Sequence, residues 1–219
     1  MQEGSSFITL ITAGPALLIA VVLHEIAHGY VAERFGDPTA RLAGRLTLNP
    51  IKHIDLFMTI IVPAVLIVSG SPIIFGGAKP VPVDPRNFDN PKRAMGWVAV
   101  AGPVTNFVLA LIAYILLRVV ELFDISALSG VTLTGGFILF LIYSIIINVI
   151  LAVFNLIPVP PLDGGRIAVA LLPLKAARPL ARLEPFGLLI VVALLFSGVL
   201  QQLLGPVLNF VMENLIGIS

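Results

Sequence analysis

The chain has 219 residues, of which 58% are hydrophobic and only 11% are charged, and its formal net charge is +1. Soluble globular proteins carry about 25% charged residues, so this composition and a mean hydropathy of +1.06 predict an integral membrane protein surrounded by the lipid bilayer. The near-neutral charge argues against a nucleic-acid partner, and the absence of cysteine excludes disulfides and thiolate metal ligands.

Four apolar runs are long enough to cross a bilayer, which takes about 20 apolar residues. They cover residues 7–32, 94–120, 131–157 and 186–204. A fifth run, residues 56–75, is interrupted by Pro63 and Pro72, and irregular backbone is tolerated at membrane depth only inside protein or beside water. We therefore expect an all-α polytopic membrane protein with about four to six transmembrane helices and a re-entrant or β-like segment around residues 56–85.

A single membrane domain over residues 1–219 is the simplest organisation, because the chain has no internal repeat and no low-complexity tract. Its core is expected at about residues 7–170 and a C-terminal helix at about residues 186–217. The tail from Leu203 onward fits either a short interfacial helix or a continuation of the fourth span. The N-terminus lacks the basic region of a cleavable signal peptide, so the first span is expected to remain in the mature protein.

The basic residues test the topology. If residues 56–75 dip into the membrane and return, the loops around residues 36–55, 76–93 and 158–185 share one face. Together with Arg34, just before the first loop, they hold twelve of the thirteen Lys and Arg residues. If that run crosses the membrane, the bias disappears. The positive-inside rule favours the first arrangement, with both termini outside the cytoplasm in a multi-pass protein of the cell membrane.

The first span contains "VVLHEIAHGY", residues 21–30, where two histidines and a glutamate interrupt aliphatic residues. His24 and His28 are four residues apart, so a helix places both imidazoles on one face, where they can share a metal ion. Glu25 then lies beside the metal and can serve as general base. Ionisable groups in a membrane span are costly and functional by default. The alternative is a buried polar cluster bonded to neighbouring helices.

Catalytic zinc takes three protein ligands and a water, so a third ligand is needed. The candidates are His53, Asp55, Asp163 and a few other loop acids. Asp163 follows the third span in "NLIPVPPLDGG", where the prolines prevent regular helix, and Gly164 and Gly165 permit a tight turn that aims the carboxylate inward. The alternative is that Asp163 caps the short helix predicted for "GRIAVALL". Spacing alone leaves both interpretations open.

Three motifs, "HEIAH", "GPVTN" and "NLIPVPPLDGG", occur in an order and span context that resembles the site-2 protease family of membrane-embedded zinc metalloproteases. The resemblance covers about residues 15–170 and is to the shorter bacterial and archaeal branch, which lacks a PDZ domain. It implies one Zn²⁺ per chain, bound by His24, His28 and Asp163, with Glu25 as the catalytic base. It also implies that the zinc lies below the cytoplasmic surface of the membrane, in agreement with the charge bias.

The same resemblance implies roles for two asparagines. Asn155, eight residues before Asp163, matches an asparagine that contacts the substrate backbone or the developing oxyanion. Asn106, which closes "GPVTN", matches a second position near the active site. The implied substrates are single-span or membrane-anchored proteins, whose helices must unwind before a peptide bond becomes accessible.

Two further features have more than one interpretation. "GGAKPVPV" is biased towards extended backbone, so Lys79, Pro80 and Val81 either offer an edge strand to unwound substrate or form a rim loop. His53 is either an exposed histidine near the lipid headgroups or a proton relay or transition-state donor near the metal.

Three functions are compatible with these residues. The first is an intramembrane zinc metalloendopeptidase that hydrolyses peptide bonds in or near transmembrane segments. The second is a metal transporter that uses His24, His28 and Asp163 as a transient site, but it has no need of Glu25 and usually has repeated halves. The third is a catalytically dead scaffold, which the complete set of ligands and base argues against.

Overall fold

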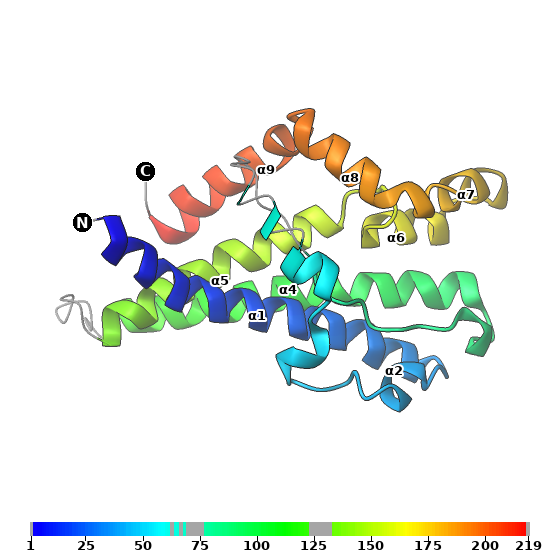
Figure 1. The fold of residues 1–219 in the computed structure, drawn as a ribbon, viewed down its shortest axis with the longest axis horizontal. Helices are drawn as coiled ribbons and strands as arrows, with labels where there is room; N and C mark the ends of the chain where they lie inside the picture. The colour runs from blue at the N-terminus through cyan, green and yellow to red at the C-terminus, as the bar shows by residue number, and fades with distance from the viewer. Residues whose placement is uncertain (1, 62–63, 66–67, 69–76, 123–132, 218–219) are drawn as a thin grey trace.

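The computed structural model describes residues 2–61, 64–65, 68, 77–122 and 133–217. Three long helices, α1 (Gln2–Arg34), α4 (Pro91–Leu122) and α5 (Leu133–Asn155), run side by side along the long axis and contact one another pairwise (Figure 1). No strand occurs among the described residues. The all-α membrane fold predicted from the sequence is confirmed.

Small side chains let the three long helices approach closely. Ala16 and Ala20 on α1, Ala99 on α4 and Ala152 on α5 are at most 1% exposed. Lipid provides no hydrophobic driving force between helices, so close van der Waals contact between small residues holds a membrane bundle together. Large apolar side chains such as Leu111 point outward and are exposed, as lipid-facing residues are.

Among the described residues, four helices are long and apolar enough to cross a membrane: Ile8–Arg34, Pro91–Leu122, Gly135–Asn155 and Leu174–Phe196. The first three confirm the spans predicted at residues 7–32, 94–120 and 131–157. The fourth span, predicted at residues 186–204, is wrong in its bounds. α8 (Gly187–Phe196) ends before Gly198, whose φ of 77° is left-handed and breaks the helix, and α9 (Val199–Phe210) begins after it.

The tail forms a helix of its own on the bundle. α9 continues into a π-helical stretch, η6 (Val211–Ile216), and packs against α5. Val211 is buried in a cluster with Leu141 and Ile145 of α5. The tail is therefore neither a separate interfacial helix nor a straight continuation of α8.

The chain between α1 and α4 leaves and returns at the same end of the bundle. α2 (Thr39–Leu42) and η3 (Pro85–Asn87) both lie at the end where α4 begins (Figure 1). Two short stretches, η1 (Pro50–His53) and η2 (Leu56–Ile61), lie between them along the chain. This agrees with the predicted re-entrant arrangement, although part of the run at residues 56–75 lies outside the described residues.

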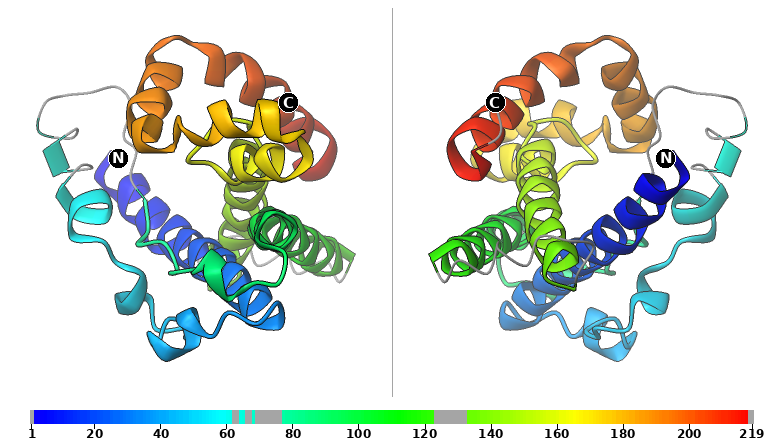
Figure 2. Two further views of the ribbon diagram at one scale, coloured as in Figure 1. Left: turned by 90° about the vertical axis from the view of Figure 1, so that its right-hand side faces the viewer. Right: turned by 90° about the vertical axis from the view of Figure 1, so that its left-hand side faces the viewer.

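The connection after α5 gathers at this same end. α6 (Asp163–Leu171), α7 (Leu174–Ala181) and η5 (Glu184–Phe186) lie together there, in the view of Figure 2, left. α1 begins and η6 ends at the opposite end of the molecule (Figure 1). The loops that carry most of the basic residues therefore share one end.

Candidate metal centre

His24, His28 and Asp163 converge inside the bundle. The Nε2 atoms of the two histidines are 3.0 Å apart, and Oδ2 of Asp163 lies 3.2 Å and 3.4 Å from them. All three residues are buried. Among the described residues they are the one group of His and acidic side chains close enough to share a metal ion, and His53 and Asp55 are not part of it.

Helix α4 passes directly over the two histidines at Gly102. A Cβ atom built on Gly102 would lie 2.5 Å from Cε1 of His24 and 2.6 Å from Cε1 of His28. Real Cβ contacts are never this short, so only glycine leaves room for both imidazoles here. The glycine of "GPVTN" thus allows α1 and α4 to meet at the centre.

The Nδ1 atom of each imidazole forms a hydrogen bond away from the centre. These two bonds determine that the ring proton is on Nδ1 and that Nε2, which faces the centre, has none. Nδ1 of His28 lies 2.7 Å from the carbonyl oxygen of Val98, which can only accept, so Nδ1 donates. Nδ1 of His24 lies 2.6 Å from Oδ1 of Asn106 and donates in the same way. In the neutral imidazoles, both Nε2 atoms therefore present lone pairs towards Asp163.

A chain of buried amides fixes the orientation of Asn106. Its Nδ2 donates to Oδ1 of Asn148 at 2.8 Å and to the carbonyl of Ala20 at 3.2 Å. Nδ2 of Asn148 in turn donates to the carbonyl of Ser144 at 2.8 Å. Nδ2 of Asn106 thus points towards Asn148 and Ala20, so its Oδ1 points towards His24 and accepts the hydrogen bond from Nδ1. Asn148 is not among the residues predicted from the sequence, although an amide within the most apolar span is a signal for it.

The geometry of this centre fits zinc. Three acceptor atoms that face one another at 3.0–3.4 Å without an intervening proton repel, and a cation between them removes that repulsion. Tetrahedral Zn²⁺ with bonds of about 2.0–2.1 Å places neighbouring ligand atoms about 3.3 Å apart. Two imidazoles and one carboxylate also leave a fourth position for water, as in catalytic rather than structural zinc sites.

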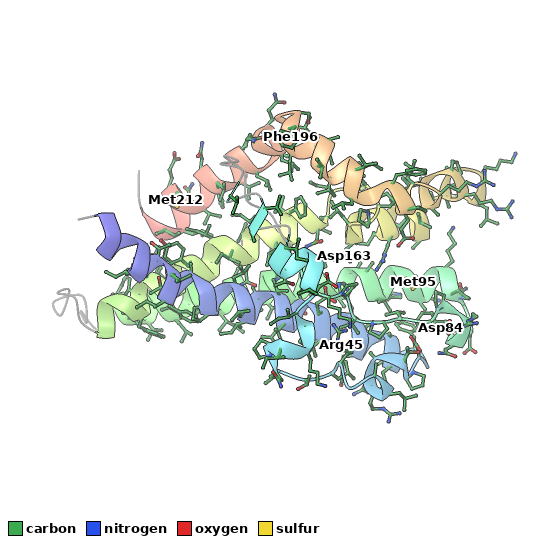
Figure 3. All side chains as sticks on the ribbon, viewed as in Figure 1. Arg45, Asp84, Met95, Asp163, Phe196 and Met212 are labelled. Atoms are coloured by element: carbon green, nitrogen blue, oxygen red, sulfur yellow. The ribbon has the colours of Figure 1, made fainter. Side chains whose placement is uncertain are left out.

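Asp163 is the first residue of α6, near the middle of the long axis (Figure 3). The N-cap of α6 is Leu162, and no side-chain capping bond is made, so the alternative that Asp163 only caps this helix is wrong. A Cβ atom on Gly164 would lie 2.2 Å from the carbonyl oxygen of Leu156, and one on Gly165 would lie 2.3 Å from the backbone nitrogen of Pro160. The two glycines are required by this close backbone packing, which holds the start of α6 against the chain before it.

Glu25 follows His24 on α1 and contacts a chain segment that we call the strap, residues 79–84. Oε2 of Glu25 accepts a hydrogen bond from the backbone N–H of Val81 at 2.8 Å. Oε1 makes no hydrogen bond with the described residues. The strap thus holds one carboxylate oxygen and leaves the other available.

Lys79, Pro80 and Val81 are already bonded within the protein. The N–H of Lys79 donates to the carbonyl of His53 at 2.8 Å, and its carbonyl accepts from the guanidinium of Arg45 at 2.6 Å. Pro80 has no N–H, and the N–H of Val81 is bonded to the glutamate. In this structure, the segment expected as either an edge strand or a rim loop is a loop whose donors are used internally.

Asp37 anchors the far end of the strap. Its fully buried carboxylate accepts hydrogen bonds from the N–H of Asp84 at 2.7 Å, from Nδ2 of Asn87 at 2.7 Å, and from the N–H and hydroxyl of Thr39. Burial favours the protonated carboxyl, but these hydrogen bonds outweigh it and hold the pKa of Asp37 below its usual 3.8. The carboxylate therefore stays ionised, and the strap anchored, at neutral pH.

Among the described residues, neither Asn155 nor His53 forms a hydrogen bond with the three converging residues. Asn155 is the last residue of α5, and its Nδ2 donates to the carbonyl of Leu151 at 2.9 Å. His53 is only 3% exposed, and its Nε2 lies 2.9 Å from the carbonyl of Thr47. The expectation of an exposed His53 is wrong, because the backbone at Thr47 and at the strap folds around it.

Comparison with known proteins gives a consistent set of relatives. Residues 13–198 match the profile of Peptidase family M50. A Bacillus subtilis protein named "Putative zinc metalloprotease YwhC" is 40% identical over 193 residues, which cover 88% of this chain and 84% of that protein. Rip2 of Mycolicibacterium smegmatis, described in the same words, is 33% identical over 84% of this chain and 66% of its own length.

A more distant relative comes from an archaeon. Zinc metalloprotease MJ0392 of Methanocaldococcus jannaschii is 29% identical over 160 residues, which cover 73% of this chain and 34% of that protein. No solved structure matches the chain.

Proposed function

Because the chain belongs to peptidase family M50 and is a zinc metalloprotease of the membrane, we propose that it cleaves other membrane proteins within or beside their transmembrane segments. Single-span and membrane-anchored proteins are the proposed substrates. The position of the candidate centre supports this proposal, since His24 and His28 belong to a helix that can itself cross the membrane. A peptide bond has to enter the bilayer to reach them.

His24, His28 and Asp163 are the proposed zinc ligands. The observation that carries this assignment is the convergence of their three acceptor atoms within 3.4 Å, with the proton of each neutral imidazole on its outer nitrogen. When bound, zinc would polarise the scissile carbonyl and lower the pKa of a bound water.

Glu25 is the proposed general base. It takes a proton from the attacking water as the water oxygen bonds to the carbonyl carbon, and it returns that proton to the amine as the C–N bond breaks. Oε1 is the oxygen free to do so, while the N–H of Val81 holds Oε2. This fixed contact keeps the carboxylate in one orientation throughout the proton transfer.

The other candidate residues are assigned supporting roles. Asn106 acts through His24, whose ring it orients. Asn155 uses one N–H within α5 and retains a second N–H, which is proposed to donate to the substrate carbonyl or oxyanion. Lys79, Pro80 and Val81 are proposed to border the path of the substrate, because the strap bonds directly to Glu25.

The orientation in the membrane follows from the charges. We propose that the end with α2 and α7 faces the cytoplasm, that both termini lie outside it, and that the centre is reached from the cytoplasmic side of the cell membrane. Support comes from the loops around residues 36–55, 76–93 and 158–185, which lie towards that end (Figure 1) and, together with Arg34 at the end of α1, hold twelve of the thirteen Lys and Arg residues.

Cleavage and zinc content, measured together, test these roles. Purified wild type, Glu25→Gln and Asp163→Asn are assayed for bound zinc and for cleavage of a membrane-helix substrate. Glu25→Gln is expected to keep its zinc but to cleave the substrate about 10²–10⁴-fold more slowly. Asp163→Asn is expected to lose both cleavage and zinc. Glu33→Gln is the matched control, because it makes the same change on α1 in a side chain that pairs with Arg41.

Undiminished cleavage by Glu25→Gln would remove Glu25 from the mechanism. A metal transporter would instead continue to move zinc across vesicles in the Glu25→Gln variant, since transport needs the ligands but no base.

A further inference from the structure

Two adjoining cavities open beside the first turns of α4. One, of about 330 Å³, lies between α4, α6 and α7, and the other, of about 460 Å³, lies between α4 and α6. Lys92 and Ala170 line both. His24, His28 and Asp163 line neither, so the cavities are separate from the metal centre.

The walls of both cavities are largely apolar. Met95, Val169 and Ala177 line the smaller cavity, and Val100 and Ile167 line the larger one. Figure 3 labels Met95 on the stretch of α4 that lies across from α6. Volumes of this size are in the range of small-molecule sites, about 300–1,000 Å³. The walls suit a hydrocarbon chain rather than a polar ligand.

Positive charge surrounds these apolar walls. Lys92, Arg166 and Arg178 line the smaller cavity, and Arg93 lines the larger one. Among the described residues that line the two cavities, Glu184 is the one acidic residue, and it pairs with Arg166 at 2.9 Å.

The remaining cations are available to a ligand. Lys92 donates one hydrogen bond to the carbonyl of Leu172 at 2.5 Å and has two further N–H groups. Arg178 is exposed on α7. An apolar hollow with a cationic edge is complementary to an anionic amphiphile.

Exposed apolar side chains place this edge at a membrane surface. Trp97, which lines the larger cavity, is 52% exposed, and Leu171 and Leu174 are exposed beside the cavities. Tryptophan is enriched where lipid headgroups meet the hydrocarbon. The cationic side chains belong to the first turn of α4 and to α6 and α7, which lie at the basic end of the bundle, opposite the termini (Figure 1).

We propose that these cavities bind an anionic phospholipid. Its phosphate lies against Lys92, Arg93 and Arg178, and an acyl chain occupies the apolar space along Met95. Basic hollows between transmembrane helices are suited to acidic headgroups. An acidic peptide would satisfy the cations, but it would leave the apolar walls and the exposed Trp97 without a partner, which favours lipid.

Lipid binding to the purified full chain tests this proposal. Native mass spectrometry in detergent compares retention of phosphatidylglycerol with that of phosphatidylcholine of the same chain length. Wild type is expected to retain the anionic lipid preferentially. Each removed cation is expected to weaken retention about fivefold, so the double variant Lys92→Gln/Arg178→Gln falls about 25-fold in affinity.

Two further variants separate the site from general surface charge and from folding. Lys175→Gln removes one charge from the same helix as Arg178 but lies outside both linings, so it is expected to retain lipid as wild type does. Ala181→Trp fills the smaller cavity from an exposed position without changing the charge, and it is expected to lose lipid.

Three results would overturn the proposal. The first is equal retention of the two lipids by wild type, and the second is an equal loss in Lys175→Gln and Arg178→Gln. The third is displacement of the lipid by inorganic phosphate or by an acidic peptide, which would show that charge alone is recognised.

Discussion

The orientation of His24, a proposed zinc ligand, depends on residues outside the group of three converging side chains. The carbonyl oxygen of Asn106 holds the proton of the imidazole on Nδ1, and Asn148 holds Asn106 in the orientation that allows it. Partners that orient a ligating histidine commonly change metal affinity by about 10–100-fold when they are removed. The protonation state of one nitrogen is thus determined by an amide on a third helix.

Replacing Asn148 by leucine is expected to weaken zinc binding by about 10–100-fold. The substitution removes the acceptor for Nδ2 of Asn106, whose amide is then free to rotate and present its own N–H groups to His24. The zinc dissociation constant, measured by competition with a chelator, is the readout. Asn214→Leu is the control, because Asn214 is exposed and bonds only within its own helical stretch. Wild-type affinity in Asn148→Leu would contradict this role.

At the scale of the helices, the centre exists because α1 and α4 approach closely at one point. Gly102 leaves the space that both imidazoles occupy. α6 brings Asp163 to the histidines at its first residue, which is held by the packing of Gly164 against Leu156. Gly102 and Gly164 are therefore needed because other parts of the chain pack closely against them.

Gly102→Ala is expected to lower both stability and zinc content. Its Cβ would overlap His24 and His28, and overpacking of this kind costs about 1–3 kcal/mol. Thermal unfolding and bound zinc are measured together. Gly136→Ala on α5 is the matched control: nothing lies within 4 Å of a Cβ there, so stability should be unchanged or rise by up to about 1 kcal/mol. Equal behaviour of the two variants would refute the steric argument.

The sequence predicts the elements better than the contacts between them. His24 and His28 follow from helical spacing, and the first three spans follow from hydropathy, because both signals are local. The hydrogen-bond partners of Asn148 and the steric need for Gly102 depend on which helices meet, so no local pattern reveals them. The break at Gly198 was missed because one glycine barely changes the hydropathy of an apolar run.

At the scale of the whole molecule, the loops with most of the Lys and Arg residues lie towards one end. Both described chain ends lie at the other end (Figure 1). The chain between α1 and α4 returns to the end it left, as the charge bias predicts. His53 illustrates the limit of that reasoning: charge counts place its loop at one end, but only the folded strap shows that its side chain is buried.

Cysteine labelling tests the proposed orientation, since the chain has no native cysteine. Lys52→Cys and Lys175→Cys are expected to react with a membrane-impermeant reagent from the cytoplasmic side, because both lie in the basic loops. Glu213→Cys, on the exposed face of η6, is expected to react from outside. Reaction of Lys52→Cys and Lys175→Cys from opposite sides would exclude the re-entrant arrangement.

The left-handed Gly198 also limits how far α8 can reach across a membrane. α8 has 10 residues, and at about 1.5 Å per residue it covers only about half of a hydrocarbon layer of about 30 Å. α8 and α9 meet at an angle at Gly198 (Figure 1). α8 alone is therefore too short to cross the bilayer, and beyond it the chain continues in a new direction, set by the left-handed Gly198, along α9.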